Sequence, residues 1–148
     1  MIEIRQMTVK DYETISVHGE QWWKGRIPTE LVAKNYMNSG PALSFWHNGT
    51  LLMVAGIVSP WPRSGEAWAV LSPEATRNAV GLNRAAARVI LWLAKGMGLR
   101  RLQAHVRSDF RVGNRWVEWL GFTKEGEMKE FGPEGEDFNR YVMFLEVV

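Results

Sequence analysis

The sequence predicts a single α/β domain built on a mixed β-sheet. Alternating apolar and polar residues mark six or seven short strands, and helical patterns separate several of them. The chain has 148 residues, enough for one hydrophobic core, and no repeat, linker or low-complexity tract divides it. With 46% hydrophobic and 23% charged residues, the composition is that of a globular protein and argues against disorder.

The first half of the chain is predicted to contain a strand, two helices and then three strands. In order these are a strand at 2–8, a helix from Thr8 that fades near Gly19, a helix at 29–37, and strands at 42–47, 51–58 and 65–71. Asp11 follows Thr8 by three residues, the spacing of a reciprocal helix cap. His47-Asn48-Gly49 lies between two apolar runs and predicts a hairpin turn.

The second half is predicted to alternate helices and strands and to close with a hairpin. In order its elements are a helix at 83–97, a strand at 102–107, a helix through Val112, Trp116, Trp119 and Leu120, and strands near 123–131 and 140–147. Ser72-Pro73-Glu74 is typical of a helix start, and Gly121 is expected to end the last helix. The helical spacing of the four apolar residues predicts that they form one face.

Charge is unevenly distributed along the chain. Residues 77–117 carry nine arginines and lysines against one aspartate, a balance of +8, and residues 118–137 carry seven acids against two lysines, a balance of −5. A basic middle favours an anionic ligand there, and mutual neutralisation of the two segments is the alternative. The basic residues spread over a helix, a strand and a loop with no reading motif, so nucleic acid is not an expected partner.

Several function classes are excluded by what the sequence lacks. Without cysteine there is no disulfide, no thiolate zinc site and no cysteine nucleophile. The three histidines are too widely spaced to predict a metal site. No apolar run has the length of a membrane span, and the N-terminus lacks the apolar stretch of a signal peptide. We therefore expect a cytoplasmic protein with no membrane attachment.

The end of the chain carries the most specific family resemblance. Trp119-Leu-Gly-Phe-Thr-Lys-Glu-Gly126, followed by Gly135, Asp137 and Tyr141, resembles the ribosomal-protein and amino-group branch of the GNAT superfamily of N-acetyltransferases. Together with the element order, the resemblance covers nearly the whole chain. It implies a GNAT-like fold: a central mixed sheet of six to seven strands with splayed parallel middle strands (65–71 and 101–107), and about four helices. It also implies an acyl-CoA in the V-shaped gap between those strands.

The resemblance assigns the acetyl-CoA contacts to two neighbouring segments. It implies that backbone groups of Val70 and Leu71 orient the thioester. The nearest match to the family's pyrophosphate loop is Asn78-Ala-Val-Gly81-Leu-Asn83, which keeps one glycine and has asparagine at its first and last positions. The residues that it predicts to hold the pyrophosphate are Arg77, Asn78, Gly81, Asn83 and Arg84. The alternative is that Ser72 starts one continuous helix and that no phosphate loop exists.

Three residues are candidates for proton transfer. Glu66 opens the strand at 65–71, where several family members carry a catalytic glutamate, and its alternative is a solvated charge at a strand end. His105 lies on the neighbouring strand, on the face of Gln103, and its alternative is a structural histidine. Tyr141 is a candidate acid because Val117 stands where the family often has a tyrosine, and its alternative is a core tyrosine.

Two functions from different classes remain open. The first is an acyl-CoA-dependent N-acetyltransferase acting on a primary amine of a small molecule or protein, with Trp22 and Trp23 shaping the acceptor pocket. The second is a catalytically inactive GNAT-fold protein that binds protein partners, because the chain also resembles internal virion proteins of tailed phages. The shared features are the Trp-bearing strand before Ser72, the Arg-rich helix after it and Val112-Gly113-Asn114.

The second function changes the expected location and contacts. It implies a virion or an infected host cell, and it makes the paired tryptophans part of an interface with a protein partner or a second copy of the chain. If the protein is an enzyme, we expect the gap between the middle strands to be open at the Gly81 end. If the protein is an inactive scaffold, we expect side chains such as Leu82 or Trp92 to fill that gap.

Overall fold

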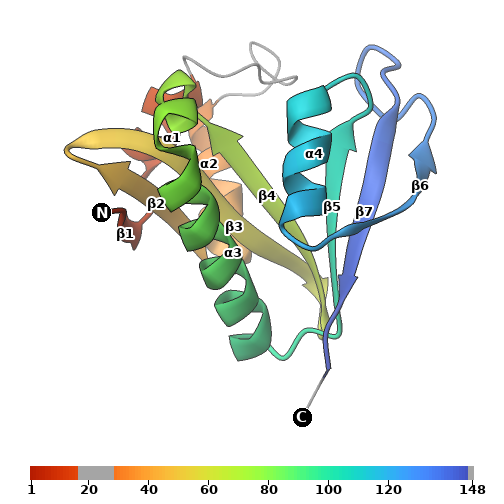
Figure 1. The fold of residues 1–148 in the computed structure, drawn as a ribbon. Helices are drawn as coiled ribbons and strands as arrows, with labels where there is room; N and C mark the ends of the chain where they lie inside the picture. The colour runs from red at the N-terminus through yellow and green to blue at the C-terminus, as the bar shows by residue number, and fades with distance from the viewer. Residues whose placement is uncertain (17–28, 147–148) are drawn as a thin grey trace.

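A seven-stranded sheet runs through the molecule in the order β1-β2-β3-β4-β5-β7-β6 (Figure 1). The structure is a computed structural model and describes residues 1–16 and 29–146. The strands are β1 (Glu3–Gln6), β2 (Ala42–His47), β3 (Thr50–Trp61), β4 (Ser64–Leu71), β5 (Arg101–Arg107), β6 (Thr123–Met128) and β7 (Phe138–Phe144). The helices are α1 (Val9–Ser16), α2 (Thr29–Ser39), the 3-10 helix η1 (Pro73–Asn78), α3 (Ala79–Gly96) and α4 (Arg111–Trp119). The predicted α/β class is confirmed.

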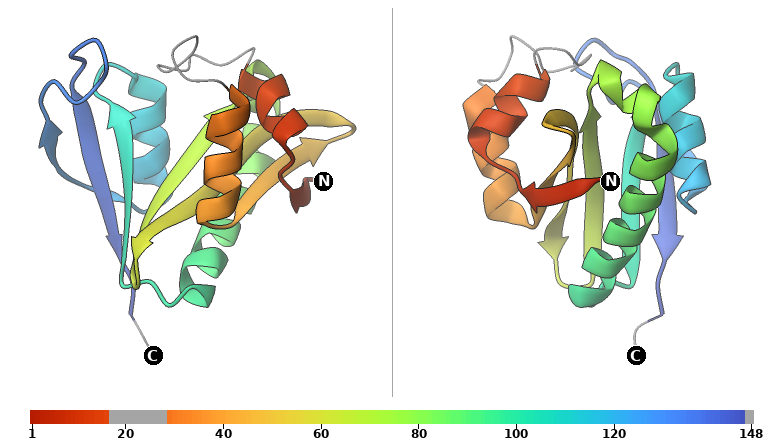
Figure 2. Two further views of the ribbon diagram at one scale, coloured as in Figure 1. Left: turned by 180° about the vertical axis from the view of Figure 1, so that it is seen from behind. Right: turned by 60° about the vertical axis from the view of Figure 1, so that its left-hand side comes forward.

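Helices cover both faces of the sheet, α1 and α2 on one and α3 and α4 on the other (Figure 2). Buried side chains of α1 and α2, Tyr12, Ile15 and Ala33 among them, pack on β3 and β4. On the opposite face, α3 packs on β2 and β3 through Leu82 and Ala86, and α4 packs on β5 and β7 through Val117. None of the described helices is both long enough and apolar enough to span a membrane.

The middle of the sheet opens into a V. Strands β4 and β5 are parallel and pair only at Ser64–Arg101, Gly65–Leu102 and Glu66–Gln103 within the described chain. Beyond this point β4 continues along β3 as far as Leu71, whereas β5 pairs with β7 along its full length. The predicted splayed parallel pair is therefore confirmed, and Figure 1 shows the opening between the two half-sheets.

Three local signals in the sequence produce the turns that they predict. The Thr8 hydroxyl accepts from the Asp11 N–H (3.1 Å) and the Asp11 carboxylate accepts from the Thr8 N–H (3.0 Å), so the reciprocal cap starts α1. Asn48 and Gly49 both have positive φ, as the β2–β3 hairpin requires. Gly121 ends α4 with φ +107°.

Two predictions about helices need correction. Helix α3 begins at Ala79 rather than at 83, because Pro73–Asn78 forms a separate 3-10 helix that ends where α3 starts. In α4, Val112 and Trp119 are exposed, and the buried residues are Gly113 and Val117. A Cβ on Gly113 would lie 3.1 Å from Val106, so the missing side chain lets α4 approach β5 on this face.

A substitution at Gly56 tests how closely the chain packs against the sheet at this position. The missing side chain of Gly56 leaves room for the Pro41 carbonyl oxygen, which would lie 2.2 Å from a Cβ. We predict that Gly56→Ala lowers the free energy of unfolding by about 1–3 kcal/mol, because a rigid backbone oxygen must move. Gly126→Ala is the control, since nothing lies within 4 Å of its Cβ, and should stay within about 0.5 kcal/mol. Chemical denaturation measures both, and equal values would contradict this explanation.

Candidate functional site

The parting of β4 from β5 leaves backbone donors of β4 facing the gap. The Ser72 N–H donates to the Leu52 carbonyl of β3 (2.9 Å), and β4 stays in register with β3 from Glu66 to Leu71. Backbone groups alternate sides along an antiparallel strand, so the N–H of Val70 also turns toward β3. The N–H of Leu71 then turns the other way, into the gap. Of the two residues predicted to orient a thioester, Leu71 is the one whose N–H faces this space.

Glu66 and His105 meet at the base of the V. Glu66 is the last residue of β4 paired with β5, and its carboxylate Oε1 pairs with His105 Nδ1 across the gap. The side chains are 34% and 17% exposed, so solvent reaches the carboxylate more easily than the imidazole. The second imidazole nitrogen, Nε2, is buried and has no hydrogen-bond partner. The structure thus joins two of the predicted proton-transfer residues into one acid–base pair.

An aromatic cluster adjoins this pair on the face covered by α1 and α2. Trp68 follows Glu66 by two residues on β4 and stacks on Tyr36 of α2, with ring centroids 3.9 Å apart and planes 14° apart. Tyr12 of α1 packs edge-on against Trp68 (6.2 Å). Burial, together with the nearby Glu66 carboxylate, raises the pKa of Tyr36 to about 12. The electrostatic effect of Glu66 therefore extends to α2.

On the other side of His105 stands Phe131, from the turn between β6 and β7. Its ring centroid lies 5.4 Å from that of His105 and 5.2 Å from that of Phe138. The ring is 51% exposed. The acid–base pair is therefore flanked by aromatic rings on both sides, one set from α2 and β4 and the other from the β6–β7 turn.

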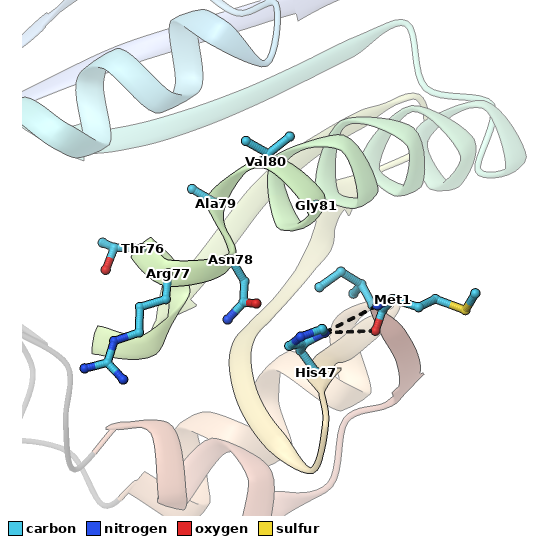
Figure 3. A pocket seen from close by; sticks show the side chains of 9 residues that line it. Met1, His47, Thr76, Arg77, Asn78, Ala79, Val80 and Gly81 are labelled. Atoms are coloured by element: carbon cyan, nitrogen blue, oxygen red, sulfur yellow. Dashed lines mark hydrogen bonds between the residues drawn. The ribbon is translucent and has the colours of Figure 1, made fainter.

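The start of α3 holds the residues predicted to bind the pyrophosphate. Asn78–Asn83 is not an irregular loop, since α3 is already helical from Ala79. Residues Thr76–Gly81 line a hollow of about 340 Å³ with Met1, Ile2 and His47, on the side of α3 away from α4 (Figure 3). On one side of this hollow, His47 Nδ1 donates a hydrogen bond to the carbonyl oxygen of Met1 (3.2 Å). Arg77 and Arg84 are exposed near this helix end.

Trp116 of α4 bridges the gap on the opposite face from the acid–base pair. Its indole N–H donates to Asn83 Oδ1 of α3 (2.8 Å). The ring packs against the cluster around Leu102 and Val117 and also against the cluster around Leu82. Trp92, named as a side chain that could fill the gap, is instead 71% exposed, and Leu82 is buried beneath α3.

Tyr141 lies in the core between β7 and α4. Its hydroxyl donates to Asn114 Oδ1 (2.8 Å) and lies 3.3 Å from Glu118 Oε1. Burial, with the neighbouring Glu118 charge, raises the pKa of Tyr141. Its assignment as catalytic acid stays a prediction. Trp22 and Trp23, predicted to shape an acceptor pocket, lie outside the described residues.

The aromatic residues of this site were only partly visible in the sequence. The sequence marks Trp68 as a tryptophan on the middle strand and Trp116 as part of a helix face, but it assigns neither to the site. Tyr36 and Phe131 were not singled out. The alternation of β4 was the available signal, because it puts Trp68 on the same face as Glu66.

Comparison with known proteins identifies the architecture. No family model and no curated protein matches the sequence. The ribosomal-protein-S18-alanine N-acetyltransferase of Escherichia coli superposes with a TM-score of 0.80 at 15% identity, over 100% of this chain and 96% of that one. A GNAT-family acetyltransferase of Streptococcus pneumoniae gives 0.72 at 16%, over 99% and 100%. YncA of Salmonella typhimurium, solved with its cofactor acetyl-CoA, gives 0.76 at 18%, over 98% and 94%.

These likenesses define the class of fold. The chain has the GNAT acetyltransferase fold, with a seven-stranded mixed sheet, a parallel β4–β5 pair and, in the residues that the structure describes, four α-helices. At 13–18% identity the superpositions show the fold alone. The activity has to be argued from the residues of the site.

Removal of the Tyr141 hydroxyl tests whether this group is structural. We predict that Tyr141→Phe lowers the free energy of unfolding by about 1 kcal/mol, because the buried bond to Asn114 is lost. Urea denaturation measures this change. Unchanged stability would contradict the structural role. A hundredfold fall in the rate of acyl transfer by the fully folded variant would assign the hydroxyl to the reaction.

Proposed function

We propose that the protein is an acyl-CoA-dependent N-acetyltransferase that acts on a primary amine of a small molecule or protein. The Glu66–His105 pair carries this proposal, because it places a proton-accepting group where the two middle strands part. The pair lies on the face of α1 and α2, and the Leu71 N–H points into the gap five residues further along β4. An acetyl-CoA-dependent reaction implies a cytoplasmic protein.

The residues around the gap fit an acyl-CoA. The unpaired edge of β4 offers the Leu71 N–H to a carbonyl oxygen, and the buried Ser72 hydroxyl at the end of that strand has no hydrogen-bond partner. The first turn of α3 directs its backbone N–H groups toward the start of the helix, and Arg77 and Arg84 add positive charge there. Acetyl-CoA supplies an acyl group activated as a thioester.

The chain's own groups then manage protons and charge. Glu66, coupled to His105, takes a proton from the bound ammonium through intervening water, so that the amine nitrogen has a free lone pair. The Leu71 N–H donates to the oxygen on which negative charge develops. A carbon–nitrogen bond forms and the carbon–sulfur bond breaks. The ammonium and acetyl-CoA become the acetamide, free CoA as the thiol and one proton, which Glu66 and His105 pass to solvent.

One observation favours a second candidate function. The Trp116–Asn83 hydrogen bond ties α4 to α3 across the gap, which suits a scaffold that no longer admits a cofactor. In that case the protein is a catalytically inactive GNAT-fold protein of the phage type, located in a virion or infected cell, and its ligand is a protein partner or a second copy. The two candidates differ in whether acetyl-CoA binds.

Trp116 decides between these candidates. We predict that the protein binds acetyl-CoA at one site with micromolar affinity, and that Trp116→Phe binds it about two- to tenfold more tightly. The variant keeps an aromatic ring but lacks the N–H, so opening the bridge no longer costs a hydrogen bond. Trp92→Phe, at an exposed position on the same face, is the control and should match the wild type.

Calorimetric titration with acetyl-CoA measures these affinities. No binding to either folded protein up to millimolar ligand would overturn the enzyme proposal and support the inactive scaffold. Weaker binding by Trp116→Phe would show that the indole N–H contacts the cofactor instead of excluding it.

Glu66 tests the chemical step itself. We predict that Glu66→Gln lowers the rate of acetyl transfer about a hundredfold or more, because the amide cannot accept the ammonium proton. Acetyl-CoA binding should be unchanged. Glu146→Gln, at an exposed position near the end of the chain, is the control. Unchanged turnover in Glu66→Gln would remove this residue from the reaction.

A further inference from the structure

We propose that the acceptor is a primary amine bound as its ammonium ion and carrying a flat apolar group without a carboxylate. The Glu66 carboxylate attracts the cation, and Phe131 packs against the apolar group. This inference rests on the proposed function for the reacting step, whereas the amine site itself is defined by the residues around Glu66 and His105.

The Glu66 carboxylate is the group of this site that attracts a cation. In the described part of the chain, the Glu66 carboxylate pairs with His105 and with no lysine or arginine. It remains 34% exposed, so an incoming ammonium reaches it. The stacked Tyr36 and Trp68 lie on the same face, and aromatic rings attract cations through their electron-rich surfaces.

Phe131 offers an apolar surface that is held in place before any ligand arrives. Its ring packs edge-on against Phe138. The preceding residue, Glu130, has φ +54° and donates its N–H to the Asp137 carboxylate (3.0 Å), which fixes the turn. Lys129 also contacts Asp137 (3.3 Å). The half-exposed ring therefore loses little conformational freedom on binding a ligand.

A comparison with Phe144 shows that exposure alone does not make a phenylalanine part of the proposed amine site. Phe144 is also exposed, but it lies opposite Arg101 at the closed end of the V, and the Arg101 guanidinium covers its ring at 5.8 Å. Phe131 instead faces His105 beside the acid–base pair. A substitution at Phe144 therefore removes an exposed ring of the same kind without touching the site.

Glu66 also disfavours acceptors that carry a carboxylate near the amine. A second negative charge next to Glu66 would be repelled, with no described arginine or lysine paired to Glu66 to offset it. Free amino acids are therefore expected to bind less well than the corresponding decarboxylated amines. This expectation separates 2-phenylethylamine from phenylalanine, which differ by that one group.

Binding and turnover of four probes test the inference. The probes are 2-phenylethylamine, n-butylamine, 2-phenylethanol and phenylalanine. We predict that 2-phenylethylamine binds more tightly than the other three to the protein without acetyl-CoA, as measured by ligand-observed NMR titration. Phe131→Ala should weaken its binding about two- to tenfold and leave n-butylamine unchanged, while Phe144→Ala changes neither.

The outcomes separate this inference from the proposed function. CoA release from acetyl-CoA, followed with a thiol reagent, reports acetyl transfer. Amine binding that depends on Phe131, without CoA release, supports the amine site and overturns the transferase proposal. CoA release with an acceptor preference that Phe131→Ala does not alter overturns the inference alone. Equal binding of 2-phenylethylamine and 2-phenylethanol also overturns it, because the cation would then contribute nothing.

Discussion

The separation of β4 from β5 after three residue pairs determines the rest of the structure. Up to Glu66 and Gln103 the two strands share a sheet; beyond them each belongs to a different half of the molecule. One half joins β4 to β3 and carries α1, α2 and α3, and the other joins β5 to β7 and carries α4. Because backbone groups along the free edge of β4 have no strand partner, the gap contains hydrogen-bond donors that a ligand can satisfy.

Among the described residues, two polar side-chain contacts cross this gap, one on each face of the sheet. Glu66 and His105 join the halves on the face of α1 and α2, and Trp116 and Asn83 join them on the face of α3 and α4. The first contact brings an acid and a base together near solvent, so it has chemical value as well as structural value. The second is a neutral hydrogen bond worth about 1 kcal/mol, which a tightly bound ligand can replace. The Trp116–Asn83 contact can therefore give way to a ligand that enters the gap.

The sequence predicts most of the fold because its signals are local. Strand alternation, the Thr8–Asp11 cap and the Asn48-Gly49 turn act between residues close in the chain, and all three are confirmed. The site was predicted only in part, because its contacts join distant segments. The sequence indicates Glu66 and His105 separately as candidates for proton transfer, but their pairing depends on how two parallel strands diverge. The apolar spacing predicts the wrong face of α4 because one of its two buried residues is Gly113, which has no hydrophobic side chain to detect.

The fold determines where the unevenly distributed charges of the sequence lie in the molecule. Part of the basic middle is neutralised by the acidic segment, since Arg101 pairs with Glu125, which also pairs with Arg140. Helix α3 keeps its positive charge, because its sequence contains basic residues and no acid. The opposite face of the sheet presents the Glu66 carboxylate among aromatic rings. An anion and a cation can thus approach the same gap from opposite faces, which is the arrangement needed to bring a polyanionic acyl donor to a protonated amine.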